Sequence, residues 1–196
     1  MEKIIFMHTS RILKVVNSTR RPPNTLKIVV EERVPQAIWQ TGDDFFFISQ
    51  DSVLTEQLPN GYATSTVNFL RLVDISAEPA LVGEHVETNK LLEFTSQIKA
   101  VWPAKTGTQI HEIQLPSRAS PDIFIVSGKS WKVYMDLNAN PARQLESLSL
   151  ILNKEIPPDK LANLAYIDLR LGNTAYYCFR NEPCDSITTP QVPSAE

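Results

Sequence analysis

The sequence predicts an α+β fold: a mainly antiparallel sheet with two helices packed on one face. Strand-like segments outnumber helical ones, and several of them follow one another through short turns. Two longer segments repeat apolar residues at the helical period. Strands joined by short turns pair as hairpins, so the sheet is expected to be mainly antiparallel with its helices segregated to one side.

The N-terminal part is predicted to hold one strand, one helix and a second strand. Residues 4–6 read as a short strand. Residues 10–16 read as a helix, capped by Thr9 or Ser10, because the apolar residues within 12–16 lie on one helical face. Residues 25–31 alternate between apolar and polar side chains, which indicates a half-buried strand.

The following block is rich in β-structure. Residues 37–40 and 45–49 flank a turn containing Gly42, as in a hairpin. Residues 55–68 are polar and read as irregular, and residues 70–75 read as a strand.

The second half supplies both helices and the remaining strands. Residues 84–101 show a helical repeat that Pro103 is expected to stop, and a second helix runs from Asn140 to about residue 153. The other segments are strands, at 108–115, 123–126, 131–135, 164–171 and 174–179. Residues 182–196 are rich in Pro, Ser and Thr without periodicity, which predicts a disordered tail.

Composition excludes some classes of function. The 196 residues are 42% hydrophobic and 21% charged, which is typical of a globular chain. The formal net charge of −3 argues against a nucleic-acid partner, because such proteins carry basic surfaces. No apolar stretch reaches the ~20 residues that a membrane helix needs, and no signal peptide is visible at Met1.

Motifs for catalysis or metal binding are lacking in the sequence. The three histidines lie in different predicted elements, and residues 127–130 read as a hairpin turn rather than a phosphate loop. Asp168 and Arg170 share one face of a strand and are expected to form a structural ion pair. We therefore expect no enzyme activity, no cofactor and no metal.

The two cysteines, Cys178 and Cys184, cannot complete a structural zinc site, which takes four ligands. Two free thiols are favoured over a local disulfide, which stays an alternative.

The last predicted strand, residues 174–179, has no successor and is a natural sheet edge. It is rich in aromatic residues and carries no charge before Arg180. Edge strands offer unpaired N–H and C=O groups to strands of other chains. The alternative is that Tyr176 and Tyr177 simply pack on neighbouring strands, one on each face.

Two segments together resemble the FtsQ/DivIB family of bacterial cell-division proteins. Residues 21–39, RPPNTLKIVVEERVPQAIW, look like the end of that family's POTRA domain and its junction with the β domain, and residues 46–54 follow as its next hairpin would. Residues 166–170, YIDLR, are similar to the family's closing strand motif. The resemblance covers roughly residues 4–180.

The resemblance implies three parts. Residues 1–35 form a partial POTRA-like αβ segment, residues 36–181 an FtsQ/DivIB-type β domain, and residues 182–196 the tail. Family members carry a membrane helix before the POTRA domain, so the anchor expected in the full-length family is absent from this chain, which is expected to be N-terminally truncated and, by itself, soluble.

The resemblance also implies a function: a non-enzymatic divisome scaffold on the extracytoplasmic face of the bacterial cytoplasmic membrane, at the division site. Partners would be FtsB/DivIC-like and FtsL-like division proteins, bound by β-strand addition at the C-terminal edge strand. By position after the YIDLR motif, Leu171 lies where the family has an aromatic contact residue and Phe179 lies near its terminal Trp. The predicted partner-binding residues are Leu171, Asn173, Thr174, Ala175, Tyr176, Tyr177, Cys178 and Phe179. The alternative function is an extracytoplasmic POTRA-like adaptor that handles exported polypeptides.

Overall fold

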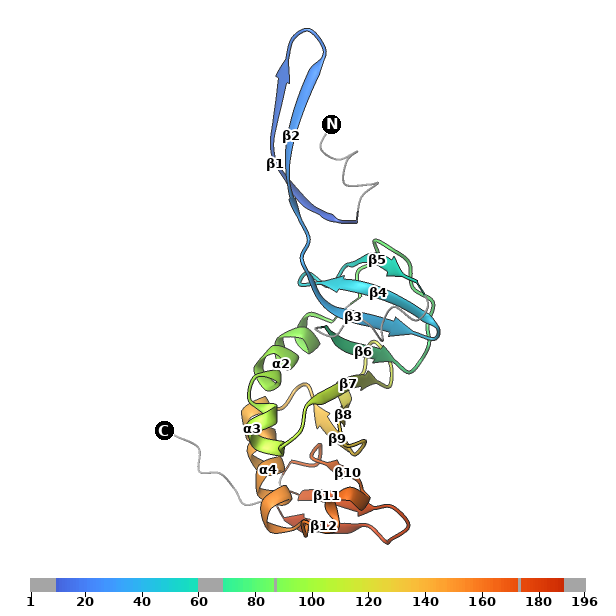
Figure 1. The fold of residues 1–196 in the computed structure, drawn as a ribbon, viewed down its shortest axis with the longest axis vertical. Coiled ribbons are helices and arrows are strands. Elements are labelled where there is room, and N and C mark those ends of the chain that lie inside the picture. The colour runs from blue at the N-terminus through green and yellow to red at the C-terminus, as the bar shows by residue number, and fades with distance from the viewer. Residues whose placement is uncertain (1–9, 60–68, 87, 173, 189–196) are drawn as a thin grey trace, which may run out of the picture.

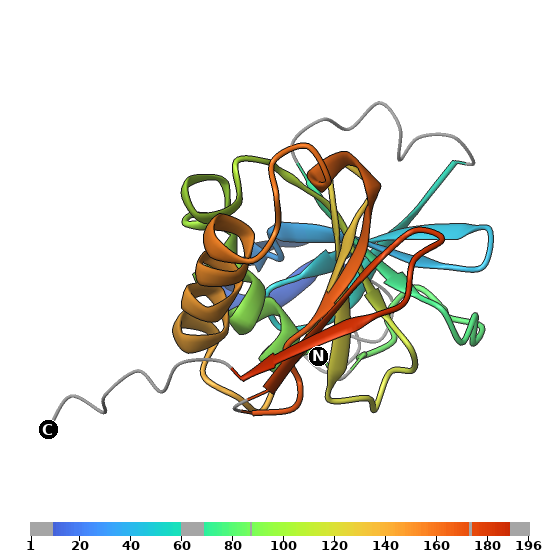
Figure 2. The same ribbon diagram turned by 90° about the horizontal axis from the view of Figure 1, so that it is seen from below.

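The computed structural model describes residues 10–59, 69–86, 88–172 and 174–188. These residues form a two-stranded ribbon and a ten-stranded mixed sheet with helices on one face, which confirms the predicted α+β class (Figures 1 and 2). The strands are β1 (Ile12–Arg21), β2 (Thr25–Glu32), β3 (Pro35–Thr41), β4 (Asp44–Ser49), β5 (Leu54–Leu58), β6 (Leu70–Asp74), β7 (Ile110–Leu115), β8 (Asp122–Ser127), β9 (Lys132–Asp136), β10 (Leu164–Asp168), β11 (Thr174–Phe179) and β12 (Asp185–Thr188). The helices are α2 (Asn89–Lys99), α3 (Trp102–Thr106), α4 (Pro141–Lys154) and the short 3-10 turn η2 (Leu161–Asn163).

The strand order in the large sheet is β12-β11-β10-β9-β8-β7-β6-β3-β4-β5. Six of its nine strand pairs are antiparallel, as expected from the hairpins. The other three, β3–β6, β6–β7 and β9–β10, are parallel. Two of these connections contain helices, and a helical crossover returns the chain to the same end of the sheet, which makes the next strand parallel.

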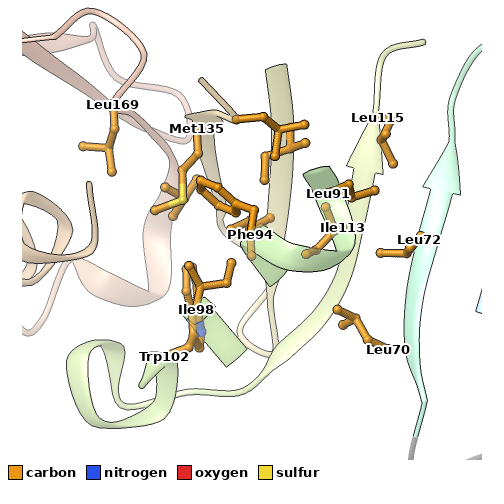
Figure 3. Close-up of a cluster of buried hydrophobic side chains, with 14 of the residues drawn as sticks. Leu70, Leu72, Leu91, Phe94, Ile98, Trp102, Ile113, Leu115, Met135 and Leu169 are labelled. Carbon is orange, nitrogen blue, oxygen red and sulfur yellow. The ribbon is translucent and has the colours of Figure 1, made fainter. Parts of the chain in front are cut away.

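The core lies between the sheet and the helices. Leu91, Phe94 and Ile98 of α2 face the inner side chains of β6 and β7 (Figure 3). The rings of Trp102 and Trp131 are fully buried and stack with their centroids 6.2 Å apart. The helix α4 begins as predicted at Asn140, whose side chain accepts a hydrogen bond from the Arg143 N–H at 3.1 Å.

The predicted helix over residues 10–16 is wrong, because residues 12–21 form β1. Its pairing with β2 has register shifts between Ile12 and Lys14 and between Val15 and Asn17. Each shift inserts an extra residue and breaks the strict alternation of a strand, so the apolar spacing resembles that of a helix. The segment that we expected to be POTRA-like is therefore a β-ribbon over the described residues, and residues 4–6 lie outside them.

Several other boundaries differ from prediction: the strand expected over 164–171 ends at Asp168, and the strand expected over 108–115 begins at Ile110. The helix expected over 84–101 spans 89–99, and a second short helix begins at Trp102 with Pro103 in its first turn. Proline is compatible with a first turn because its missing N–H would have no helical partner there. Residues 55–58, expected to be irregular, belong to β5, and residues 60–68 lie outside the described ranges.

The predicted disordered tail is wrong for residues 185–188. They form β12, which pairs with β11 in antiparallel register. Main-chain pairing with an available strand edge overrides the weak propensity of a short Pro-flanked segment. Residues 189–196 lie outside the described part of the chain.

The Arg33 side chain links the start of β1 to the large sheet. Its side chain donates to Asp51 at 2.9 Å and to the main-chain carbonyls of Ser10 and Ile12 at 2.8 and 2.6 Å. Ser49 donates to the same Asp51 carboxylate at 2.7 Å. Burial raises the pKa of Asp51, but the hydrogen bonds from Ser49 and Arg33 and the Arg33 charge outweigh it, so its pKa lies below the ordinary value.

We expect this link to depend on pH. Because the pKa of Asp51 is lower in the folded protein than in the unfolded chain, its contribution is complete above the ordinary Asp pKa of 3.8 and is lost as the pH falls further. Thermal unfolding of the parent and of Asp51→Asn should therefore differ at pH 7 and converge near pH 2. A difference that persists unchanged at pH 2 would contradict an ionic origin.

Candidate partner-binding edge

The predicted edge strand β11 lies between two strands. It pairs with β10 on one side and with β12 on the other, so the prediction that residues 174–179 form the outer edge is wrong. Sequence reasoning missed β12. Cys184, the residue before β12, was the signal in the sequence, because a bond to Cys178 holds the following residues beside β11.

Cys178 and Cys184 form a disulfide, so the favoured prediction of two free thiols is wrong and the alternative holds. The bond joins the penultimate residue of β11 to the residue before β12. A buried Cys178 and an exposed Cys184 meet because the turn between them reverses the chain. Both sulfurs are used in this bond, which leaves neither as a thiolate ligand for a metal.

The side chains of β11 divide as the alternation predicted. Ala175, Tyr177 and Phe179 face the core side, where Ala175 and Phe179 are buried and Tyr177 is half-buried. Tyr176 and Cys178 point to the opposite face, where Tyr176 is 39% exposed. The other predicted residues are the exposed Leu171, the half-buried Thr174 and Asn173, which lies outside the described residues.

Phe179 was predicted as an interface contact near the family's terminal Trp, yet its ring is only 6% exposed and lies under the Lys160 ammonium, 5.1 Å from the ring centroid. We therefore expect Phe179→Ala to lower the free energy of unfolding by about 3 kcal/mol, as for other buried aromatic residues. The matched Tyr176→Ala should change stability by less than about 0.5 kcal/mol, because its side chain is exposed. Urea unfolding of both variants checks this, and equal stabilities would contradict the assigned faces.

The turn before β11 is fixed by the predicted ion pair, which is confirmed. Arg170 contacts Asp168 at 2.6 and 2.9 Å and also reaches Asp122 at 2.6 Å. The hydrogen bonds that Arg170 donates to Asp168 raise its pKa and outweigh burial, which lowers it, so the pKa of Arg170 lies above its ordinary value. Arg170 thus joins β10 to β8.

An aromatic row crosses the helix-free face beside this cluster. Phe124, Tyr134 and Tyr166 lie on β8, β9 and β10, with ring centroids 4.4 and 4.9 Å apart. The Tyr166 hydroxyl lies 3.7 Å from the Cys184 sulfur. Burial, the Tyr166 hydroxyl and the Asp168 charge raise the pKa of Tyr134. The row ends at the disulfide and supports β11 from the face opposite the core.

The opposite end of the sheet is covered by the chain itself. Leu54 of β5 donates to the Glu84 carbonyl at 2.9 Å and accepts from Gly83 at 2.7 Å. Ser10 bonds the Thr55 carbonyl at 2.8 Å, and Arg11 pairs with Glu56. At the β12 end, no other strand among the described residues continues the sheet. Within the described part of the chain, the C-terminal end is therefore the less covered of the two.

Other features that could indicate a function are a pocket with free polar groups, a metal-binding cluster and a membrane-spanning helix. A hollow of about 300 Å³ beside the start of α4 is lined in part by Gln144 and Arg170. Gln144 is hydrogen-bonded to the main chain of Asp136, and Arg170 forms ion pairs with Asp122 and Asp168. No group of three or more His, Cys, Asp or Glu side chains within the described ranges could hold a metal ion. None of the helices in those ranges has the length and apolar character needed to span a bilayer.

Comparison with known proteins gives an informative match. No family model matches the chain. The chain is 23% identical over 171 residues to the cell division protein DivIB of Clostridium acetobutylicum, which covers 84% of this chain and 63% of that protein. The chain thus spans less than two thirds of its relative's length. The predicted resemblance to the FtsQ/DivIB family of cell-division proteins is confirmed by this similarity.

Proposed function

We propose that this protein is a non-enzymatic divisome scaffold that acts in bacterial cell division and septum formation. The similarity to DivIB over 84% of the chain supports a role in division. The scaffold would bind FtsB/DivIC-like and FtsL-like division proteins by β-strand addition at the C-terminal end of its sheet. The ribbon of β1 and β2 would belong to the POTRA-like segment that precedes the β domain.

The accessibility of the C-terminal end carries the binding proposal. At the β5 end, main-chain and side-chain groups of residues 10–11 and 83–86 occupy the edge. At the C-terminal end the only described cover of β11 is the four-residue β12. A partner strand that adds to a sheet binds through main-chain hydrogen bonds. It therefore requires an edge strand whose N–H and C=O groups are unpaired or are paired only with a short strand.

The disulfide supports an extracytoplasmic location. Bonds such as Cys178–Cys184 persist in oxidising compartments and are rare in the cytosol, where thiols are kept reduced. We therefore propose that the scaffold acts at the outer face of the cytoplasmic membrane.

Calorimetric titration of the full chain with the extracytoplasmic segments of FtsB/DivIC-like and FtsL-like proteins from the same genome tests the proposal. We expect saturable binding of at least one segment, retained when Gln57, on the opposite edge strand β5, is replaced by Arg. Absence of binding to both segments, or its loss in Gln57→Arg, would contradict binding at the C-terminal end.

A further inference from the structure

The strand β12 occupies the edge position at which a partner strand would join β11. It pairs with β11 in antiparallel register through Thr174↔Thr188, Ala175↔Ile187, Tyr176↔Ser186 and Tyr177↔Asp185. Within the described residues it is the outermost strand at this end of the sheet. A partner that adds directly to β11 must therefore take the place of β12.

The N–H groups of β11 that point toward β12 can be assigned, because N–H directions alternate along a strand. The Arg180 N–H donates to the Asn163 carbonyl at 2.8 Å, on the β10 side of β11. Because successive N–H groups of a strand point to opposite sides, those of Ala175 and Tyr177 point toward β12. These two groups would bind a partner strand, and they lie opposite Ile187 and Asp185 of the chain's own segment.

Short-range links hold β12 in position. The Cys178–Cys184 bond fastens the residue before β12 to β11, and Lys160 pairs with Glu182 in the intervening turn at 2.9 Å. The strand itself has only four residues, fewer than the six of β11. A short strand contributes few ladder hydrogen bonds, so its docking depends on the tether that keeps it close to the edge.

We propose that β12 is an internal substitute for the partner strand: it covers the β11 edge in the free protein, is displaced when the partner binds, and is held by the Cys178–Cys184 bond. This inference rests on the proposed function for the identity of the competing strand. An edge that is open in only a fraction of molecules binds a partner more weakly by that same fraction. Partner affinity is thus set by how firmly β12 is held.

Amide hydrogen exchange tests the displacement without any partner. In full chains carrying Cys178→Ser and Cys184→Ser together, we expect the N–H groups of Ala175 and Tyr177 to exchange at least about tenfold faster than in the parent. The N–H groups of Val133 and Ile167, deeper in the sheet, should keep their rates. Unchanged rates at β11, or equal acceleration throughout the sheet, would overturn the proposal.

A second variant tests the competition. Ile187→Pro removes an N–H from the register opposite Ala175 and should release β12, so the same FtsB/DivIC-like segment should bind more tightly. If β12 covers nine molecules in ten, the gain is about tenfold. Weaker or unchanged binding would overturn the proposed displacement of β12, since the partner strand would then pair with β12 rather than replace it. If no variant binds the segment while β11 exchange still accelerates, the proposed function fails and the displaceable strand stands.

Discussion

Tyr177→Pro is expected to abolish partner binding while the protein remains folded. The proline lacks the N–H that alternation assigns to the outer side of β11, and it prevents a ladder from continuing there. The hydrogen bonds to β10 come from the neighbouring residues, so the inner ladder survives. Titration with the FtsB/DivIC-like segment and circular dichroism check the two halves of this expectation.

Two matched variants isolate the main-chain effect. Tyr177→Ala loses the same half-buried side chain but keeps the N–H, and it should still bind the partner. Tyr176→Pro removes an N–H that points to β10 and should unfold the C-terminal corner instead. Binding by Tyr177→Pro equal to that of Tyr177→Ala would show that β11 does not receive the partner strand.

Arg170→Ala is expected to produce the largest loss of stability among the charged residues of this corner. It leaves Asp168, which is 9% exposed, and Asp122 side by side without their cation, and it removes the guanidinium from over the Phe124 and Tyr134 rings. Breaking a buried pair in this way costs about 3 kcal/mol, at the low end of the usual range because Arg170 is partly exposed. For a chain of this size the Tm should fall on the order of 10 °C.

A double-mutant cycle measures the interaction energy between Asp168 and Arg170 separately from the packing that each side chain contributes. Asp168→Ala should also destabilise, but Asp168→Ala combined with Arg170→Ala should cost clearly less than the sum of the two, because each single change leaves an unpaired charge. Additive losses in urea unfolding would contradict the assigned coupling. Normal stability together with lost partner binding would show that the pair serves the interface rather than the fold.

Local patterns in the sequence predicted most of the elements. The β8–β9 hairpin and the start of α4 at Asn140 follow from turn and cap residues that act over a few positions. The parallel pairs β3–β6, β6–β7 and β9–β10 depend on where the chain returns after a crossover, which short-range patterns do not encode. The bulges in β1 made a strand resemble a helix, because its alternation is broken twice within a few residues.

The candidate site was predictable in part. Alternation separated Tyr176 and Cys178 from Tyr177 and Phe179, but it could not tell which face meets the core, where the structure buries Phe179. The Cys178–Cys184 bond and β12 depend on three-dimensional proximity across a turn. The separation of the two cysteines in the sequence is compatible with a disulfide and with free thiols. It therefore did not determine whether residues 185–188 form a strand beside β11.

Site-specific photo-crosslinking tests most directly whether the C-terminal end of the sheet receives the partner. A photoreactive phenylalanine analogue in place of the exposed Tyr176 should form a covalent adduct with the FtsB/DivIC-like segment, whereas the same analogue in place of Gln57 on β5 should not. Mass spectrometry of the adduct should locate the crosslink in an extended segment of the partner. Crosslinking from Gln57 and none from Tyr176 would contradict the account.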